Sequence, residues 1–239
     1  MKNRGAAKGF FITGTGTEVG KTFVSRILVQ TFSKRMNVSY MKPVQTGCLR
    51  LKRREQLVAP DFEYVKKHTD LVTGDQDLHV PYRFALACSP HLAARMAHEK
   101  ISLKKIKDRL NGIMGLFGAS PGCVLVEGAG GVLAPLNESE SMVHLIVLLD
   151  LPVILVTTSG LGTLNHTFLS ICALQSCGAK IAGVVMNSPQ KNPEDFIYKD
   201  NRETIRSFVR PVPFLEIKYN AQTSPRTLEF CNELAKRYL

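Results

Sequence analysis

Short apolar runs recur along the chain, and they do not alternate between apolar and polar residues. Uninterrupted runs of this kind are typical of β-strands that are covered on both faces, as in a parallel sheet. The runs are also rich in residues that favour strands. The pattern therefore predicts six strands, at residues 9–14, 38–43, 123–128, 152–160, 181–188 and 211–215.

Stretches with the helical spacing of apolar residues separate these runs. They predict helices at residues 21–34, 61–68, 91–99, 102–116, 141–149, 164–177, 193–208 and 225–238. This alternation predicts an α/β fold, doubly wound, with a mainly parallel sheet flanked by helices and right-handed crossovers. We expect residues 1–239 to form a single domain, because a chain of this length buries one sizeable core.

The composition, with 44% hydrophobic and 21% charged residues, is that of a globular protein. The first apolar run is too short for the core of a signal peptide, and His144, Asp150 and Pro152 interrupt the longest apolar stretch. We therefore expect no membrane span and a cytoplasmic location. The six cysteines have no Cys-x-x-Cys pair and no metal-ligand spacing, so we expect buried or free thiols.

The net charge of +11 raises the question of a nucleic-acid partner, and Arg50 together with residues 52–54 forms a local basic run. A solvated loop explains this run better, because no aromatic interleaving or recognisable nucleic-acid module accompanies it. An anionic small substrate such as ATP would also suit a basic surface. We therefore expect no nucleic-acid partner.

The segment GTGTEVGKT, residues 14–22, follows the first predicted strand and nearly matches a phosphate-binding loop. The usual pattern is Gly, four residues, then Gly-Lys-Ser/Thr, but Thr15 stands at the place of the first glycine. An extra residue changes the path of the loop without removing its backbone N–H donors. Lys21 would neutralise phosphate charge, and the Thr22 hydroxyl would reach Mg²⁺ at the start of the following helix.

Polar residues follow the other predicted strands as well. Lys42 ends the second strand, Glu127 ends the third, a turn with Asn165 and His166 follows the fourth, and Asn187 ends the fifth. The carboxyl ends of parallel strands meet at one edge of a sheet, where ligands of such folds bind. The sequence thus predicts one polar site at this edge.

Glu127 is the first candidate for a magnesium ligand, because Mg²⁺ bound to a triphosphate takes only one or two carboxylates from the protein. The second carboxylate is harder to choose, since Asp61, Asp70, Asp75 and Asp77 all follow the second strand. Asp61 lies at a predicted helix start, where its carboxylate can point into the site. The sequence equally allows it only to cap that helix.

Lys42, in the segment MKPVQTG, also has two interpretations. It is either an inert surface lysine or a cation that stabilises charge on a transferring phosphoryl group. His91 and His166 lie at predicted helix starts, where packing or capping is the commoner role of a histidine. No Ser-His-Asp order suggests nucleophilic catalysis.

Six segments in order, GTGTEVGKT, KPVQTG, SPHLAA, VEGAGG, LGTLNH and MNS, resemble the dethiobiotin synthase family. The resemblance extends from about residue 9 to residue 215. It implies a P-loop NTPase-like fold and a homodimeric, Mg²⁺-dependent enzyme. Such an enzyme converts 7,8-diaminononanoate, CO₂ and ATP to dethiobiotin, ADP and phosphate through a carbamate and a carbamic-phosphoric anhydride.

The resemblance also implies roles for individual residues. Lys42 and Lys21 are expected to be catalytic, and Thr22, Asp61 and Glu127 to hold magnesium. The expected ATP-binding set is Glu18, Val19, Gly20, Lys21, Thr22, Phe23, Asp61, Glu127, Gly128, Ala129, Gly130, Asn187, Ser188, Pro213, Phe214 and Leu215. The expected diamine or carbamate set is Thr17, Thr46, Gly130 and Asn165, with residues 161–166 at the dimer interface.

Two features depart from the family pattern. Gly16 stands where many members have aspartate, and residues 47–60 are unusually basic. One alternative is a partitioning ATPase of the same fold, but such proteins open the loop with Lys-Gly-Gly, and residues 13–17 contain no lysine. A second alternative is a related amidoligase that acts on a different amine or carboxylate.

Overall fold

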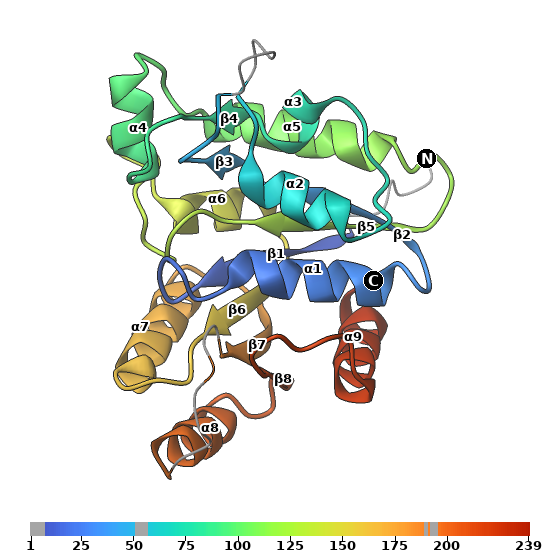
Figure 1. The fold of residues 1–239 in the computed structure, drawn as a ribbon, viewed down its shortest axis with the longest axis vertical. Coiled ribbons are helices and arrows are strands. Elements are labelled where there is room, and N and C mark those ends of the chain that lie inside the picture. Colours follow the sequence, from blue (N-terminus) through green and yellow to red (C-terminus); the bar gives the residue numbers. More distant parts are fainter. Residues whose placement is uncertain (1–7, 51–56, 189–190, 192–195) are drawn as a thin grey trace.

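The computed structural model describes residues 8–50, 57–188, 191 and 196–239. Within these residues, a six-stranded sheet has the order β2-β5-β1-β6-β7-β8, and every pairing is parallel. Its strands are β1 (Gly9–Gly14), β2 (Asn37–Met41), β5 (Gly122–Glu127), β6 (Val153–Thr157), β7 (Ile181–Asn187) and β8 (Phe214–Ile217). The chain runs from β1 to the edge strand β2, returns to β5 beside β1, and then crosses to β6, β7 and β8 on the other side (Figure 1), which confirms the predicted doubly wound sheet.

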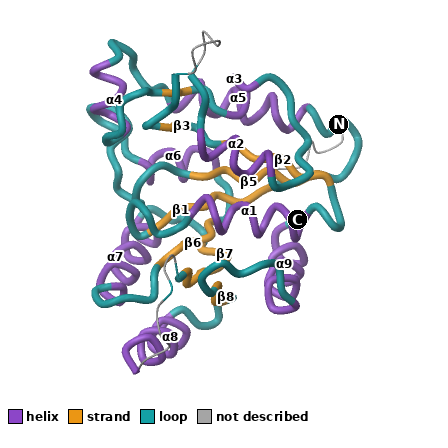
Figure 2. Tube along the Cα trace, in the orientation of Figure 1, coloured by secondary structure: helices purple, strands orange, loops and turns teal. Residues whose placement is uncertain are grey.

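Helices cover both faces of this sheet (Figures 1 and 2). One face packs against α1 (Lys21–Phe32), α2 (Pro60–Lys67) and α9 (Pro225–Tyr238). The other face packs against α4 (Pro90–Met96), α5 (Leu103–Gly115), α6 (Met142–Leu149), α7 (Thr163–Ser176) and α8 (Phe196–Phe208). The helices therefore leave the carboxyl edge of the sheet to the loops that follow the strands.

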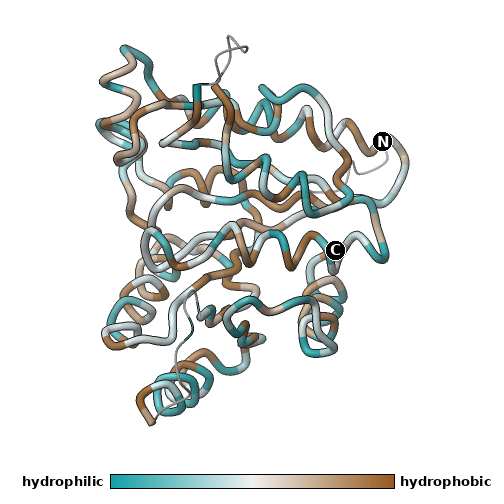
Figure 3. Tube along the Cα trace, in the orientation of Figure 1, coloured by the Kyte–Doolittle hydropathy of each residue, from teal (hydrophilic) through white to brown (hydrophobic). Residues whose placement is uncertain are grey.

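The two apolar clusters explain why the strands lack alternation. In β1, Phe10 and Ile12 belong to the cluster beneath α1, whereas Phe11 belongs to the cluster on the opposite face. All six residues of β1 are buried. Successive side chains of a strand point to opposite faces, so a strand covered on both faces must be apolar throughout. Figure 3 shows the central strands in brown and more teal on the outer helices.

A second, small parallel sheet consists of β3 (Val44–Gln45) and β4 (Tyr82–Arg83), with the short helix α3 (Gln76–His79) before β4. Gln45 pairs with Arg83 in this sheet. The sequence pattern did not predict these elements, because strands of two residues and a helix of four residues are too short to show a period. This sheet places Gln45 beside the start of α2, where it contacts Asp61.

The last predicted strand is wrong in position. The sequence pattern predicts it at residues 211–215, but β8 runs from Phe214 to Ile217. Pro211 and Pro213 have no N–H to donate to a ladder, which favours a strand that begins after them. Residues 193–195 of the predicted seventh helix and the basic residues 52–54 lie outside the described part of the chain. Across the described residues, no helix is both long and apolar enough to span a bilayer.

Candidate active site

The loop between β1 and α1 has the backbone shape of an anion site. Glu18 and Gly20 both have positive φ angles, of 61° and 87°, and Gly20 forms the N-cap of α1 without a side-chain capping bond. The first N–H groups of a helix have no partner within the helix, and they carry the positive end of its dipole. Although Gly14 stands one residue earlier than in the usual pattern, the loop still ends at a helix N-terminus that is suited to phosphate.

Lys21 is buried beside this loop, and its Nζ donates a hydrogen bond to the carbonyl of Gly16 at 2.7 Å. Burial, together with the positive charge of Lys42, lowers the pKa of Lys21 to about 8, although Glu127 and Asp61 act in the opposite direction. A phosphate group that arrives at the loop would oppose both effects. Lys21 is therefore a cation that has no carboxylate partner of its own among the described residues, which suits it to bind an anion.

Glu127, at the end of β5, is fully buried and accepts four hydrogen bonds. Its Oε1 accepts from the Thr22 hydroxyl at 2.8 Å and from the Lys42 ammonium at 2.6 Å. Its Oε2 accepts from the Ser25 hydroxyl at 2.6 Å and from the Tyr40 hydroxyl at 2.8 Å. A buried carboxylate needs such partners to stay charged. The phosphate loop, β2 and β5 thus meet at one carboxylate.

Lys42 bridges Glu127 and Asp61, with its Nζ 2.8 Å from Asp61 Oδ2. Burial works against the charged form of Lys42, but Glu127 and Asp61 outweigh it and raise the pKa of Lys42. Burial likewise works against the charge on Asp61, yet Lys42 holds the pKa of this carboxyl below its usual value. Lys42 is therefore a buried cation between two carboxylates and not a surface lysine.

The structure also distinguishes the four aspartates that follow β2. Ala59 is the N-cap of α2, so the Asp61 side chain does not cap it, and the Asp61 backbone N–H donates to Gln45 Oε1 at 3.2 Å. Asp70 is exposed, Asp75 caps α3 and Asp77 pairs with Arg83. Of these aspartates, Asp61 is the one that joins the Glu127 cluster.

The glycine-rich segment after Glu127 lies against the phosphate loop. The Gly128 carbonyl accepts a long hydrogen bond from Lys42 at 3.5 Å, and the Gly128 N–H donates to Ile12. A Cβ on Gly131 would lie 3.5 Å from the Cα of Gly16. Gly130 has a φ of 71°, which favours glycine. The segment from Gly128 to Gly131 thus begins at Lys42 and ends against Gly16 of the phosphate loop.

Asn187 connects the end of β7 to the same loop. Its Nδ2 donates to the Val19 carbonyl at 2.9 Å, whereas its Oδ1 is buried and has no hydrogen-bond partner among the described residues. The neighbouring Ser188 forms a hydroxyl contact of 3.2 Å with Ser159. An orphaned, buried amide oxygen is costly, so this atom is a good acceptor for an incoming N–H donor.

Residues 213–215 are not at this edge of the sheet. Leu215 pairs with Val185, and Ile217 is the residue that pairs with Asn187. The backbone of residues 213–215 therefore lies roughly 7 to 13 Å short of the strand ends, at about 3.3 Å per residue. Ile217 and the residues after it replace them as neighbours of Asn187.

The other predicted residues are more peripheral in this structure. Thr17, Glu18 and Asn165 are exposed, and Thr46 and Phe23 are half-buried. The guanidinium of Arg26 stacks on the Phe23 ring.

Neither histidine caps its helix. His166 is exposed on α7, whose N-cap Gly162 makes no side-chain capping bond. His91 lies in α4, and its Nδ1 is buried without a partner among the described residues.

Sequence reasoning missed Ser25, Tyr40 and Gln45. Ser25 follows Thr22 by three residues, which places both on one side of α1. Tyr40 precedes Lys42 by two residues, and Lys42 directly follows β2, so the period of an extended chain places both on the same side. These spacings were a usable signal, because a carboxylate that meets Thr22 and Lys42 also meets their neighbours. Gln45 had no such signal, since β3 was not predicted.

Comparison with known proteins matches residues 8–227 to a family model described as an AAA domain. The ATP-dependent dethiobiotin synthetase BioD of Anoxybacillus flavithermus is 34% identical over 228 residues, which cover 95% of this chain and 98% of the relative. This chain belongs to the dethiobiotin synthetase family. The family relative from Methanocaldococcus jannaschii is 35% identical over 82% of this chain and 86% of its own length. The resemblance found in the sequence motifs is thus confirmed.

Solved structures bear on the fold alone. A plasmid partition protein from Borrelia burgdorferi matches with a TM-score of 0.56 and 14% identity, and covers 98% of each chain. A second one, bound to AMPPNP, matches with a TM-score of 0.53 and 14% identity over 97% of this chain and 98% of the other. At this level of identity the likeness confirms a P-loop NTPase-like architecture for this dethiobiotin synthetase family member.

Proposed function

We propose that this protein is an ATP-dependent cyclo-ligase that converts 7,8-diaminononanoate and CO₂ to dethiobiotin, with release of ADP and phosphate. An amine of the substrate adds to CO₂ and loses a proton to give a carbamate. A carbamate oxygen then takes the γ-phosphoryl group of ATP, which gives a carbamic-phosphoric anhydride and ADP. The second amine attacks the carbonyl carbon, closes the ureido ring and expels phosphate.

One observation carries this proposal: the Lys42 ammonium, held by Glu127 and Asp61, lies beside a phosphate loop in a chain of this family. During phosphoryl transfer, Lys42 would exchange these carboxylates for oxygens of the carbamate and the γ-phosphoryl group. A cation at that point stabilises charge that develops in the transition state. The two amines of the substrate lie on adjacent carbons, so proximity favours ring closure.

ATP would bind along the edge of the sheet from the phosphate loop to β7. Lys21 and the first N–H groups of α1 would hold the phosphates. The orphaned Oδ1 of Asn187 suits the exocyclic amino group of adenine, which offers an N–H donor. Ser188 and the residues around Ile217 would complete the base pocket.

Thr22, Asp61 and Glu127 would hold the magnesium ion that accompanies ATP. The carboxylates of Asp61 and Glu127 already contact one cation, the Lys42 ammonium, and the Thr22 hydroxyl donates to the same Glu127 oxygen. Hydroxyl and carboxylate oxygens are the ligands that Mg²⁺ prefers, and two carboxylates suffice for a nucleotide-bound ion. When bound, the ion would neutralise charge on the β- and γ-phosphates.

We further propose a homodimer in which residues 161–166 contribute to the partner's substrate site, with Thr17, Thr46, Gly130 and Asn165 near the diamine. Leu161 is 92% exposed and Asn165 is exposed, which suits a surface that another subunit covers. The free state of all six cysteines supports a reducing compartment such as the cytoplasm.

The deciding assay combines purified protein, ATP, Mg²⁺, bicarbonate and 7,8-diaminononanoate, with mass spectrometry for dethiobiotin. We expect ADP and dethiobiotin in equal amounts, and no ADP when either the diamine or bicarbonate is left out. ADP formation with a different amine, and none with this diamine, would favour the related amidoligase. A dethiobiotin synthetase of known activity serves as the positive control for the conditions.

A further inference from the structure

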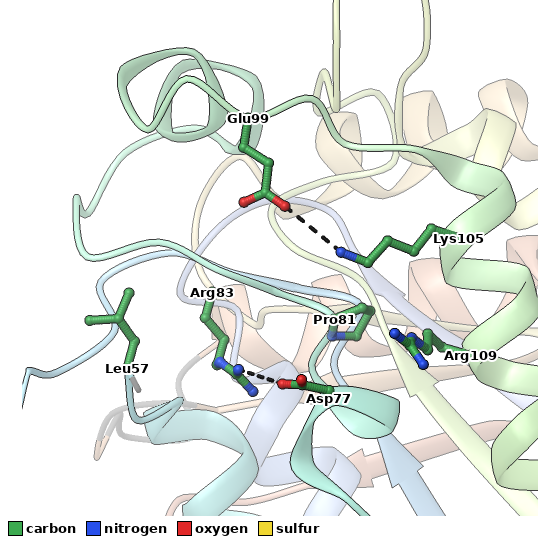
Figure 4. Close-up of a pocket in the computed structure, with 7 residues that line it drawn as sticks. All are labelled: Leu57, Asp77, Pro81, Arg83, Glu99, Lys105 and Arg109. Carbon is green, nitrogen blue, oxygen red and sulfur yellow. Dashed lines mark hydrogen bonds and ion pairs between the residues drawn. The ribbon is translucent and has the colours of Figure 1, made fainter. Parts of the chain in front are cut away.

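A pocket of about 280 Å³ lies away from the phosphate loop, between β4, α3 and α5 (Figure 4). Three basic side chains, Arg83, Lys105 and Arg109, line it together with the carboxylates of Asp77 and Glu99. The cations outnumber the carboxylates by one. The lining is therefore polar and carries a net positive charge, unlike the apolar pockets that bind most drug-sized ligands.

One terminal nitrogen of the Arg83 guanidinium has a protein partner, and the other has none among the described residues. Its Nη2 donates to Asp77 Oδ1 at 2.5 Å, and Figure 4 shows this ion pair along one wall of the pocket. The Arg83 side chain is only 13% exposed. Its Nη1 is buried and has no hydrogen-bond partner among the described residues. A buried guanidinium N–H without an acceptor is unusual, because leaving it unsatisfied costs free energy.

Lys105 and Arg109 reach the same pocket from one face of α5, because residues four apart on a helix are neighbours. Lys105 has only a loose ion pair with Glu99, at 3.8 Å, and its Nζ lies over the Tyr82 ring. Arg109 makes no ion pair with the described residues. Figure 4 shows all three basic side chains around this one pocket. Their N–H donors exceed the acceptors that the pocket itself provides.

We propose that this pocket binds a compact tetrahedral oxyanion, of the phosphate class. Donors from β4 and from two turns of α5 approach from different sides, which suits an anion whose oxygens point in several directions. Guanidinium groups form strong, charge-assisted hydrogen bonds to such oxygens. The site is separate from the phosphate loop, but Arg83 pairs with Gln45, which holds the backbone of Asp61. The proposal does not depend on the proposed function.

The test is a titration of the isotope-labelled full chain with inorganic phosphate, followed by NMR of backbone amides at constant ionic strength. We expect saturable shifts at residues 82–84 and 105–109, on a curve separate from that of residues 14–22. Arg109→Gln should weaken binding at the pocket by roughly tenfold, the loss expected for one charge-assisted hydrogen bond. The curve of the phosphate loop should not change in this variant.

Lys107→Gln is the matched control, because it removes the same charge from an exposed position of the same helix. It should leave both curves unchanged. Pocket amides that do not saturate, or that respond equally in Arg109→Gln and Lys107→Gln, would overturn the proposal. Succinate at equal ionic strength should bind more weakly than phosphate. Equal or tighter binding of succinate would overturn the assignment of a tetrahedral ligand.

Discussion

At the scale of single residues, the site is organised around two buried charges that depend on each other. Glu127 is fully buried, and Lys42 is its one cationic contact among the described residues. A buried charge without a partner is strongly unfavourable, so each residue stabilises the charged form of the other. The sequence left open whether Lys42 is inert. Its burial between two carboxylates favours a functional role.

Replacing Lys42 tests this pairing. We expect Lys42→Met to lose most turnover and to lower the free energy of unfolding by about 3 to 5 kcal/mol, because Glu127 is left unpaired. Adding Glu127→Gln should restore much of that stability while turnover stays low. Urea unfolding of the wild type, both single variants and the double variant measures the coupling. If the double variant loses as much free energy of unfolding as the two single variants together, the pairing is contradicted.

Lys21 gives a prediction about pH. Its pKa in the free protein is about 8, because of burial and the charge of Lys42. Bound phosphate should raise this pKa, so ATP binding above pH 8 must take up a proton. The affinity for ATP should then fall with rising pH, by up to roughly tenfold per pH unit, and stay level just below pH 8.

Calorimetry in buffers of different ionisation enthalpy measures this proton uptake. Lys21→Arg keeps the charge but cannot titrate in this range, so its affinity for ATP should not follow the same pH dependence. An unchanged slope in Lys21→Arg would show that another group is responsible.

At the scale of elements, the turn between β1 and α1 is held by its contact with the end of β7. Gly20 has a φ of 87°, and a Cβ added to it would lie 2.1 Å from Asn187 Nδ2. Val19 accepts the hydrogen bond from that same amide. The shape of the loop and the position of Asn187 are therefore linked through one glycine.

Gly20→Ala should disturb this link, whereas Gly16→Ala should not. A Cβ on Gly16 meets no atom within 4 Å. We expect Gly20→Ala to cost about 1 to 3 kcal/mol from backbone strain alone and to weaken nucleotide binding. Gly16→Ala should leave both properties near wild type. Chemical unfolding and ATP titration of the two variants test this, and equal effects would count against the link.

At the scale of the whole molecule, parallel strands bring residues from across the chain to one edge. Thr22, Lys42, Asp61 and Glu127 are joined there although up to 105 residues separate Thr22 from Glu127. Leu161 is exposed after β6 and Leu133 is exposed after β5, at 92% and 64%. Leu161 belongs to residues 161–166, the segment that the proposed homodimer would cover.

Leu161→Glu tests this surface. If a second subunit covers Leu161, burial of one leucine contributes about 1.5 to 3 kcal/mol, twice in a symmetric dimer. The dissociation constant of the dimer should therefore rise by roughly 100-fold or more. Sedimentation velocity over a range of concentrations measures it. Leu116→Glu, on the distant end of α5, is the control and should leave the dimer intact.

The sequence by itself determined the parallel sheet and the location of the site. Both depend on local patterns: strands buried on both faces are continuously apolar, and ligands of such sheets bind where the strands end. Lys42, Glu127 and Asn187 were predicted in this way, because each ends an apolar run, whereas Lys21 was predicted from the phosphate-loop segment that follows the first run.

Only the tertiary structure decided which distant side chains meet. It chose Asp61 from four aspartates and moved the last strand toward Ile217. It also brought Arg83 to the same pocket as the two basic residues of α5. These contacts depend on how long crossovers pack and on strands of two residues, and neither leaves a periodic trace in the sequence. Local patterns encode which face of an element is buried, whereas packing of the whole chain decides what that face touches.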